Sequence, residues 1–302
     1  MIKLTFRIFA SLFLFAAIVA CDQGEQAYQP EFTEQSSSSA NIYLFGIHPL
    51  HNPQRLHKLY GPIMGYLEQN IDGAKFKVEA SRNYNEFDKK LYAGKFDFAL
   101  PNPFQTLNSL QHGYRVFGKM GDDENFRGIF LTRKDSAIEL PTDLKGKKVS
   151  YPAKTALAAT MMPQYYLQTH GVDITQDIEN LYVGSQESSI MNAYLGNVSA
   201  AATWPIPWLA FQQEHADKAA LLELKWQTEP LINNGLVARD DMPDELVQRV
   251  ATLLSTLHES PEGQIMLAKL PISRFELADD DTFNVIQDFL NKFHQTIPNQ
   301  PE

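Results

Sequence analysis

Hydrophobic and polar positions alternate between two patterns from about residue 41 onward. Asn41–Gly46 is a short apolar run with β-branched and aromatic side chains, ended by glycine, and it predicts a buried strand. Asn52 and Pro53 then form a helix start, with a capping side chain followed by proline at the first helical position. The apolar positions of that helix recur every three or four residues: Leu56, Tyr60, Met64 and Leu67.

The same alternation continues through most of the chain. We expect further strands at Lys75–Ala80, Phe96–Leu100, Tyr114–Met120, Gly128–Thr132, Lys148–Tyr151, Asn180–Val183, Ala200–Thr203, Leu221–Trp226 and Leu231–Ala238. Helices are expected around Tyr84–Leu91 and Phe104–Leu110 and at Ala156–Thr169, Ser188–Leu195, Pro243–Ser260, Pro261–Leu270 and Thr282–Gln295. Strands that alternate with helices in this way predict an α/β fold.

The first twenty residues have a different pattern, which predicts a signal peptide. Lys3 and Arg7 precede an apolar run over residues 8–20 that ends in small side chains. The run is shorter than the roughly 20 apolar residues that a membrane-spanning helix needs. Ile18-Val19-Ala20-Cys21 resembles a bacterial lipobox, which implies that Cys21 carries acyl chains and becomes the N-terminus.

A polar stretch follows Cys21 and predicts a flexible stalk over residues 21–40. Two acyl chains hold a protein stably on a bilayer, so the mature chain would be tethered to lipid and not membrane-spanning. Asp22 resembles the signal that retains enterobacterial lipoproteins in the inner membrane. We therefore expect the periplasmic face of the inner membrane, with the outer membrane as the alternative.

Charge and cysteine content narrow the classes of function. The chain of 302 residues has 26 basic and 36 acidic residues, a net charge of −10, which becomes −12 without the signal peptide because only Lys3 and Arg7 are lost. This balance disfavours binding to nucleic acid. A single cysteine excludes an intramolecular disulfide and a zinc site built from several thiolates.

Motifs for catalysis or metal binding are weak. Gly113–Lys119 matches most of a phosphate-binding P-loop, but Met120 stands where a magnesium-binding hydroxyl is needed. His48, His51 and His57 cluster without an evident fourth ligand, so we predict no metal site and keep only ligand contact by His48. No nucleophile motif is present, and we predict neither an enzyme nor a cofactor.

Polar and aromatic side chains gather at the turns where predicted strands pass into helices. These turns are Asn83-Tyr84, Asn102–Gln105, Lys154–Ala156, Ser185–Ser188 and Thr203-Trp204. In open α/β sheets ligands bind beyond the carboxyl ends of the strands, where helix N-termini offer free N–H groups to anions. Each turn alone is also explained as an ordinary helix cap, but together they predict a site for a small anion.

Several segments, in order and spacing, resemble the periplasmic phosphate/phosphite/phosphonate-binding proteins of ABC transporters. The resembling segments cover most of residues 41–240: Gly46–Pro49 with Tyr60–Glu68, Asn83-Tyr84 with Leu91–Ala99, Gly128–Ser136, Leu140–Ser150 and Gly184–Trp204. The resemblance implies an α/β, two-lobed type II periplasmic binding protein fold with a hinge and a central ligand cleft. Lobe one would comprise 41–135 and 228–302, and lobe two 136–227.

The resemblance also implies a function and a set of binding residues. The protein would capture a small anion, a phosphonate, phosphite or phosphate, and deliver it to an ABC transporter permease in the inner membrane. Tyr84 matches the family's ligand-contacting tyrosine, Asn102–Gln105 its contact turn in lobe one, and Thr155 its phosphate-cradling turn in lobe two. The complete set of expected ligand-binding residues is Tyr84, Asn102, Gln105, Thr155, Ser185, Gln186, Thr203, Trp204 and His48.

The chain departs from the family pattern at three positions. Lys154–Leu157 replaces a Ser-Thr-Ser-Gly turn, Gln186 stands where a histidine is common, and Ser199 replaces an aspartate. Helix N–H groups and Lys154 would then balance the ligand's charge. Two alternatives remain from the sequence: a sensory lipoprotein that presents its bound state to a membrane receptor, and an exported enzyme on the same scaffold.

Overall fold

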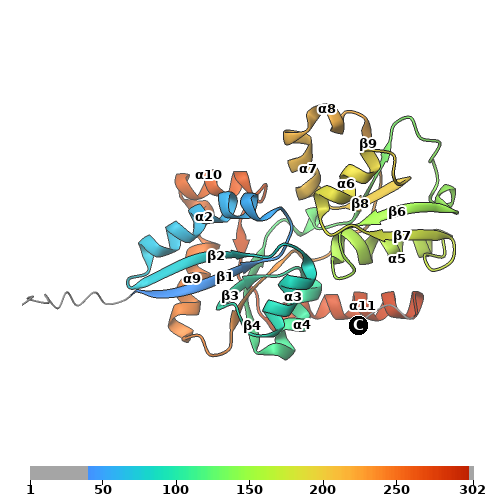
Figure 1. The fold of residues 1–302 in the computed structure, drawn as a ribbon. Helices are drawn as coiled ribbons and strands as arrows, with labels where there is room; N and C mark the ends of the chain where they lie inside the picture. The colour runs from blue at the N-terminus through green and yellow to red at the C-terminus, as the bar shows by residue number, and fades with distance from the viewer. Residues whose placement is uncertain (1–39, 299–302) are drawn as a thin grey trace, which may run out of the picture. The chain divides into compact units, whose positions relative to one another are not determined.

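The computed structural model describes residues 40–298, and two β-sheets form its framework (Figure 1). The first sheet has the strand order β11-β4-β10-β3-β1-β2. Its strands are β1 (Asn41–Ile47), β2 (Ala74–Ala80), β3 (Phe98–Leu100), β4 (Tyr114–Met120), β10 (Gly235–Arg239) and β11 (Phe275–Glu276). β1 pairs in parallel with β2 and β3, while β10 runs antiparallel to β3 and β4.

The second sheet has the order β7-β6-β8-β5-β9. Its strands are β5 (Ile129–Arg133), β6 (Lys147–Tyr151), β7 (Ile178–Tyr182), β8 (Ala200–Thr203) and β9 (Leu222–Gln227). β6 pairs in parallel with β7 and β8, and β5 lies antiparallel between β8 and β9. β11 also runs antiparallel to β4 in the first sheet. In each sheet one antiparallel strand, β10 or β5, follows a segment that comes from the other sheet.

Two crossover segments connect the sheets, and they pair with each other. The first joins β4 to β5, and the second joins β9 to β10. Thr228 N donates to Gly128 O at 2.9 Å, and Leu231 N donates to Phe126 O at 3.0 Å. These bonds hold the two connections side by side, as expected for a fold whose halves are joined by a double hinge.

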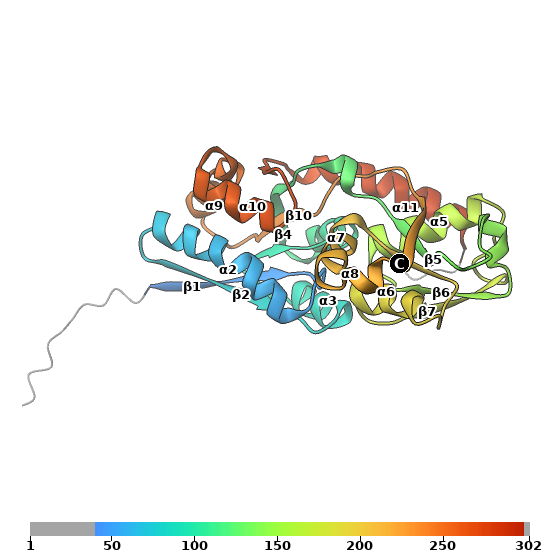
Figure 2. The ribbon, with the colours of Figure 1, turned by 90° about the horizontal axis from the view of Figure 1, so that it is seen from above.

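Helices cover both sheets (Figures 1 and 2). Those beside the first sheet are α2 (Pro53–Asn70), α3 (Tyr84–Tyr92), α4 (Pro103–Ser109), α9 (Asp244–Ser255) and α10 (Pro261–Lys269). Those beside the second are α5 (Met162–Thr169), α6 (Gln186–Tyr194), α7 (Pro205–Glu214) and α8 (Ala216–Ala219). The last helix, α11 (Asn284–Thr296), packs against both α4 and α5.

The two-lobed α/β fold predicted from the sequence is confirmed, with corrections in detail. The predicted boundary at residue 135 assigns the strand at Gly128–Thr132 to lobe one. Its hydrogen bonds instead place β5 in the second sheet, because it pairs with β8 and β9. The helix predicted at Ala156–Thr169 divides into a π-helical turn at Leu157–Met161 and α5.

The predicted signal peptide, Cys21 and nearly all of the stalk lie outside the described residues. Within residues 40–298, no helix is both long and apolar enough to span a bilayer.

Candidate functional site

A small, partly open cavity lies where the ends of both sheets meet the crossover segments. It is lined by residues from both halves of the fold: His48, Tyr84, Asn102, Phe126, Ala156–Ala159, Gln186, Trp204 and Asn234. His48 is the one lining residue with a titratable side chain of ordinary pKa near neutrality, and no Lys, Arg, Asp or Glu lines the cavity. We call this space the central cavity.

The π-helical turn at Leu157–Met161 has backbone N–H groups in residues that line the central cavity. Thr160 N and Met161 N both donate to Ala156 O, at 2.8 and 3.4 Å. The N–H groups of Leu157, Ala158 and Ala159 donate to no other backbone group among residues 40–298. Such unpaired N–H groups at a helix start, together with the helix dipole, attract an anion.

Tyr84 and Gln186 join the two halves at the cavity wall. Gln186 Nε2 donates to the Tyr84 hydroxyl oxygen at 3.0 Å, and Thr203 Oγ1 donates to Gln186 Oε1 at 2.8 Å. The Tyr84 hydroxyl is an acceptor in this contact, so its own hydrogen can be donated to a ligand. Burial raises the pKa of Tyr84, which keeps the hydroxyl protonated.

His48 is held in one protonation state by its surroundings. Its Nδ1 lies 2.8 Å from the carbonyl oxygen of Leu100. A carbonyl oxygen can only accept, so Nδ1 carries the hydrogen. Burial lowers the pKa of His48 to about 4, although the bond to Leu100 opposes this effect. The ring is therefore neutral near pH 7, and its Nε2 is a hydrogen-bond acceptor.

Four residues form a closed ring of hydrogen bonds across the two halves, which we call the Asp88 ring. Asp88 Oδ1 accepts from Gln105 Nε2 at 2.5 Å, and Asp88 Oδ2 accepts from Thr155 Oγ1 at 3.1 Å. Asn102 Nδ2 donates to Thr155 O at 2.9 Å. Asn102 and Gln105 complete the ring as a capping box at the start of α4.

The Asp88 ring holds a carboxylate largely out of water. Burial raises the pKa of Asp88 to about 6, while the hydrogen bonds from Gln105 and Thr155 lower it. Thr155 directly precedes the segment Ala156–Ala159 that lines the central cavity. The ring therefore fixes the position of the N–H groups relative to lobe one.

The residues expected to bind ligand divide into two groups in the structure. Those that line the central cavity are His48, Tyr84, Asn102, Gln186 and Trp204. Those that do not are Gln105, Thr155, Ser185 and Thr203. Gln105, Thr155 and Thr203 bond to neighbouring side chains, as described above. Ser185 Oγ accepts from Ser188 N at 3.1 Å and caps α6.

Asp88 and Asn234 are not among the residues predicted from the sequence, whereas N–H groups at the start of the helix expected at Ala156–Thr169 are. Asp88 lies four residues after Tyr84 on the same helix, so helical spacing could have suggested it. Asn234 follows Asn233 at the end of the second crossover, directly before buried β10. The signal available in the sequence was this pair of polar side chains directly before a buried strand.

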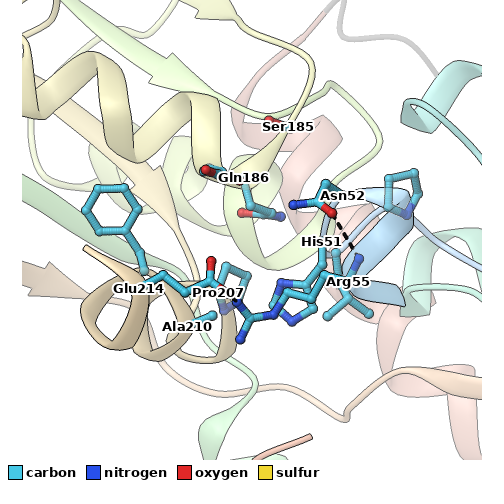
Figure 3. A pocket seen from close by; sticks show the side chains of 12 residues that line it. His51, Asn52, Arg55, Ser185, Gln186, Pro207, Ala210 and Glu214 are labelled. Atoms are coloured by element: carbon cyan, nitrogen blue, oxygen red, sulfur yellow. Dashed lines mark hydrogen bonds and ion pairs between the residues drawn. The ribbon is translucent and has the colours of Figure 1, made fainter. Parts of the chain in front are cut away.

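A second pocket shares Gln186 with the central cavity (Figure 3). It is lined by His51, Asn52, Arg55, Ser185 and Glu214 among others. Arg55 on α2 forms an ion pair with Glu214 on α7, which links the two halves again. We call this space the outer pocket.

Two lysines considered as possible binding groups instead make contacts within the protein. Lys119 of the P-loop-like segment lies within β4, where its Nζ is paired with Asp123 at 2.8 Å and Glu276 at 2.7 Å. Lys154 is exposed, and its Nζ lies over the Tyr182 ring, 5.6 Å from the centroid. Among the described residues no group of three or more His, Cys, Asp or Glu side chains is arranged to hold a metal ion.

Comparisons with known proteins identify the family. The model of a family described as "ABC transporter, phosphonate, periplasmic substrate-binding protein" matches residues 45–283, which is most of the chain. This chain belongs to that family. Its members bind solutes for transport and are not enzymes.

Individual relatives agree with this assignment. A probable ABC transporter phosphite-binding protein, PhnD1 of Prochlorococcus marinus (strain MIT 9301), is 23% identical over 146 residues. The match spans 46% of this chain and about half, 48%, of that relative.

Two solved structures share the fold. A binding protein component of a Pseudomonas aeruginosa ABC phosphonate transporter superposes with a TM-score of 0.78 at 18% identity, covering 85% of this chain and 88% of the other. PhnD1 from Prochlorococcus marinus (MIT 9301), in complex with methylphosphonate, superposes with a TM-score of 0.77 at 17% identity, covering 84% and 98%.

Proposed function

We propose that this protein captures a small phosphonate, or a phosphite or phosphate ion, in the central cavity and delivers it to the permease of an ABC transporter. The observation that carries the proposal is the set of unpaired N–H groups of Leu157, Ala158 and Ala159 beside the Tyr84 hydroxyl. These groups donate hydrogen bonds to oxygen without a cationic side chain. The methylphosphonate bound by a structural relative supports the ligand class.

Closure of the two lobes over the ligand follows from the same geometry. The Gln186–Tyr84 bond and the Asp88 ring each join a residue of one half to a residue of the other. A ligand that bridges Tyr84 and the π-helical turn adds to these bonds only in the closed arrangement. Ligand binding therefore favours the closed state, which is the form we expect the permease to recognise.

Thermal unfolding tests the proposed ligand class. Methylphosphonate, phosphite and phosphate are each titrated against the purified protein, and a ligand that binds the native state raises the melting temperature. At a concentration 100 times its Kd, a ligand stabilises the fold by about 2.7 kcal/mol. No shift with any of the three, together with a shift caused by an unrelated solute, would overturn the assignment.

The second part of the proposal is a lipid anchor at Cys21 on the periplasmic face of the inner membrane. The lipobox-like segment Ile18–Cys21 supports it. Cys21→Ser removes the only thiol of the chain, so the variant should leave the membrane fraction and fail to incorporate labelled palmitate. A variant that remains in the membrane fraction as the parent does contradicts the anchor and leaves the ligand proposal intact.

A further inference from the structure

Asn234 places an unpaired amide oxygen at the central cavity. The residue is fully buried, and its Oδ1 has no hydrogen-bond partner among the residues that the structure describes. Its Nδ2 donates to Met120 Sδ at 3.3 Å, and its backbone N donates to Asn233 Oδ1 at 2.8 Å. A buried acceptor without a donor lowers the stability of the folded protein. We therefore expect the ligand to donate a hydrogen bond to this oxygen.

His48 supplies a second acceptor to the same cavity. Because Nδ1 of the ring donates to Leu100 O, the other ring nitrogen of the neutral imidazole has only a lone pair to offer. An oxyanion without hydrogens cannot satisfy either group and is repelled by both. An oxyanion that carries one O–H can donate to one of them while its remaining oxygens accept from Tyr84 and the π-helical turn.

The neutral lining of the cavity favours the same ligand form. Lys, Arg, Asp and Glu are all missing from the described residues that enclose it. A helix N-terminus acts as about half a positive charge, which suits one negative charge better than two. A singly protonated phosphonate has one negative charge and one O–H group.

We propose that Asn234 and His48 make the central cavity selective for a singly protonated tetrahedral oxyanion. This inference rests on the proposed function and names the ligand form that the site takes. The monoanions of phosphonates and of phosphite, each with one O–H group and one negative charge, belong to this class. Sulfonates, which have the same tetrahedral shape and one negative charge but no hydrogen near neutral pH, are excluded by the two acceptors.

The test compares methylphosphonate with methanesulfonate, which match in shape, by isothermal titration calorimetry near pH 6.5. The unaltered protein should bind methylphosphonate at least tenfold more tightly than methanesulfonate, since a buried polar group left unpaired discriminates strongly. Equal affinity for the two overturns the inference and leaves the proposed function in place. Phosphite and phosphate are titrated alongside, and absence of binding by all four anions overturns the proposed function and the inference with it.

Variants of Asn234 and Tyr84 distinguish the loss of a hydrogen-bond acceptor from the loss of a hydrogen-bond donor. Asn234→Ala removes the acceptor, so the preference for methylphosphonate should fall about tenfold, whereas Asn234→Asp keeps an acceptor oxygen and should retain the preference. Tyr84→Phe is the matched control, because it removes a donor and should weaken both ligands alike. Circular dichroism and thermal unfolding confirm that each variant is folded.

An Asn234→Ala variant that loses affinity for both ligands equally would show that Asn234 donates to the anion, which contradicts the inference.

Discussion

At the scale of single residues, the site depends on groups that hold one another and not only on groups that face the ligand. Gln105 and Thr155 are expected from the sequence to bind an anion, yet both donate to the carboxylate of Asp88. Ligand affinity therefore depends on a residue that does not line the cavity. We therefore expect Asp88 to act as a positioning residue.

Replacement of Asp88 tests that role. Asp88→Ala leaves the Gln105 and Thr155 donors unpaired and releases the turn before Ala156, so affinity for methylphosphonate should fall about tenfold. Asp88→Asn can still accept from Gln105 and can donate to the Thr155 hydroxyl, so it should remain within about threefold of the parent. Calorimetric titration measures both variants. Equal losses in the two would show that the charge of Asp88 matters and the ring does not.

The buried His48 gives a pH dependence whose sign can be worked out. Its pKa is about 4 in the folded protein against 6.5 in an unfolded chain. As the pH falls from 6.5 to 4, the unfolded chain takes up a proton that the folded protein does not, so stability is lost. The loss from this residue is at most about 3 kcal/mol.

Chemical denaturation at a series of pH values measures this contribution. His48→Gln has no titrating group at this position, so the free energy of unfolding of the parent should fall relative to that of the variant between pH 6.5 and 4. The difference between the two proteins should be constant above pH 7. A difference that does not change from pH 7 to pH 4 would contradict the burial of a neutral His48.

At the scale of elements, strands and capped helices could be predicted from the sequence because their signals are local. Asn52 with Pro53, and Asn102 with Pro103, begin α2 and α4 in the structure. α7 was not predicted, because Pro205 and Pro207 resemble a loop although prolines are tolerated in the first turn of a helix. The π-helical turn depends on packing between distant segments, which no local pattern shows.

Gly128 shows how such packing positions the site. A Cβ atom at this residue would lie 2.6 Å from Ala158 O and 2.7 Å from Pro163 Cδ, so only glycine lets the first crossover lie against the π-helical turn. Asn234 and Asp88 are similar cases, because their partners are far away in sequence. These parts of the site follow from tertiary structure.

Gly128→Ala should therefore displace the turn that holds the N–H groups of Ala158 and Ala159. We expect a loss of stability of about 1–3 kcal/mol and a larger loss of methylphosphonate affinity than in a distant variant of equal stability. Gly65→Ala on α2 is a suitable control for the substitution, because nothing outside the local helix backbone lies within 4 Å of the added methyl group. Unchanged methylphosphonate affinity in Gly128→Ala would contradict the proposed dependence of the site on close packing between the first crossover and the π-helical turn.

At the scale of the whole molecule, two kinds of contact join the lobes, and they differ in strength. The Arg55–Glu214 pair at the outer pocket involves a glutamate side chain that is 52% exposed, so solvent screens it. The Gln186–Tyr84 bond and the Asp88 ring are more deeply buried. Closure should depend on the inner contacts much more than on the ion pair.

Glu214→Gln tests this ranking. Loss of a screened ion pair should change methylphosphonate affinity by less than about threefold, compared with about tenfold for Asp88→Ala. Titrations at low and high salt should also give similar affinities for the parent once buffer ionisation is matched. A tenfold loss in Glu214→Gln would make the ion pair, and not the Asp88 ring, the main contact between the lobes.

The proposed function requires the anion to bind at the π-helical turn in the central cavity. A crystal structure of the complex with methylphosphonate would locate the bound anion. We predict phosphonate oxygens within 3.2 Å of the N–H groups of Ala158 and Ala159 and of the Tyr84 hydroxyl, a distance set by ordinary hydrogen-bond geometry, about 2.7–3.2 Å. A phosphonate found instead beside Arg55 in the outer pocket would contradict binding at the π-helical turn.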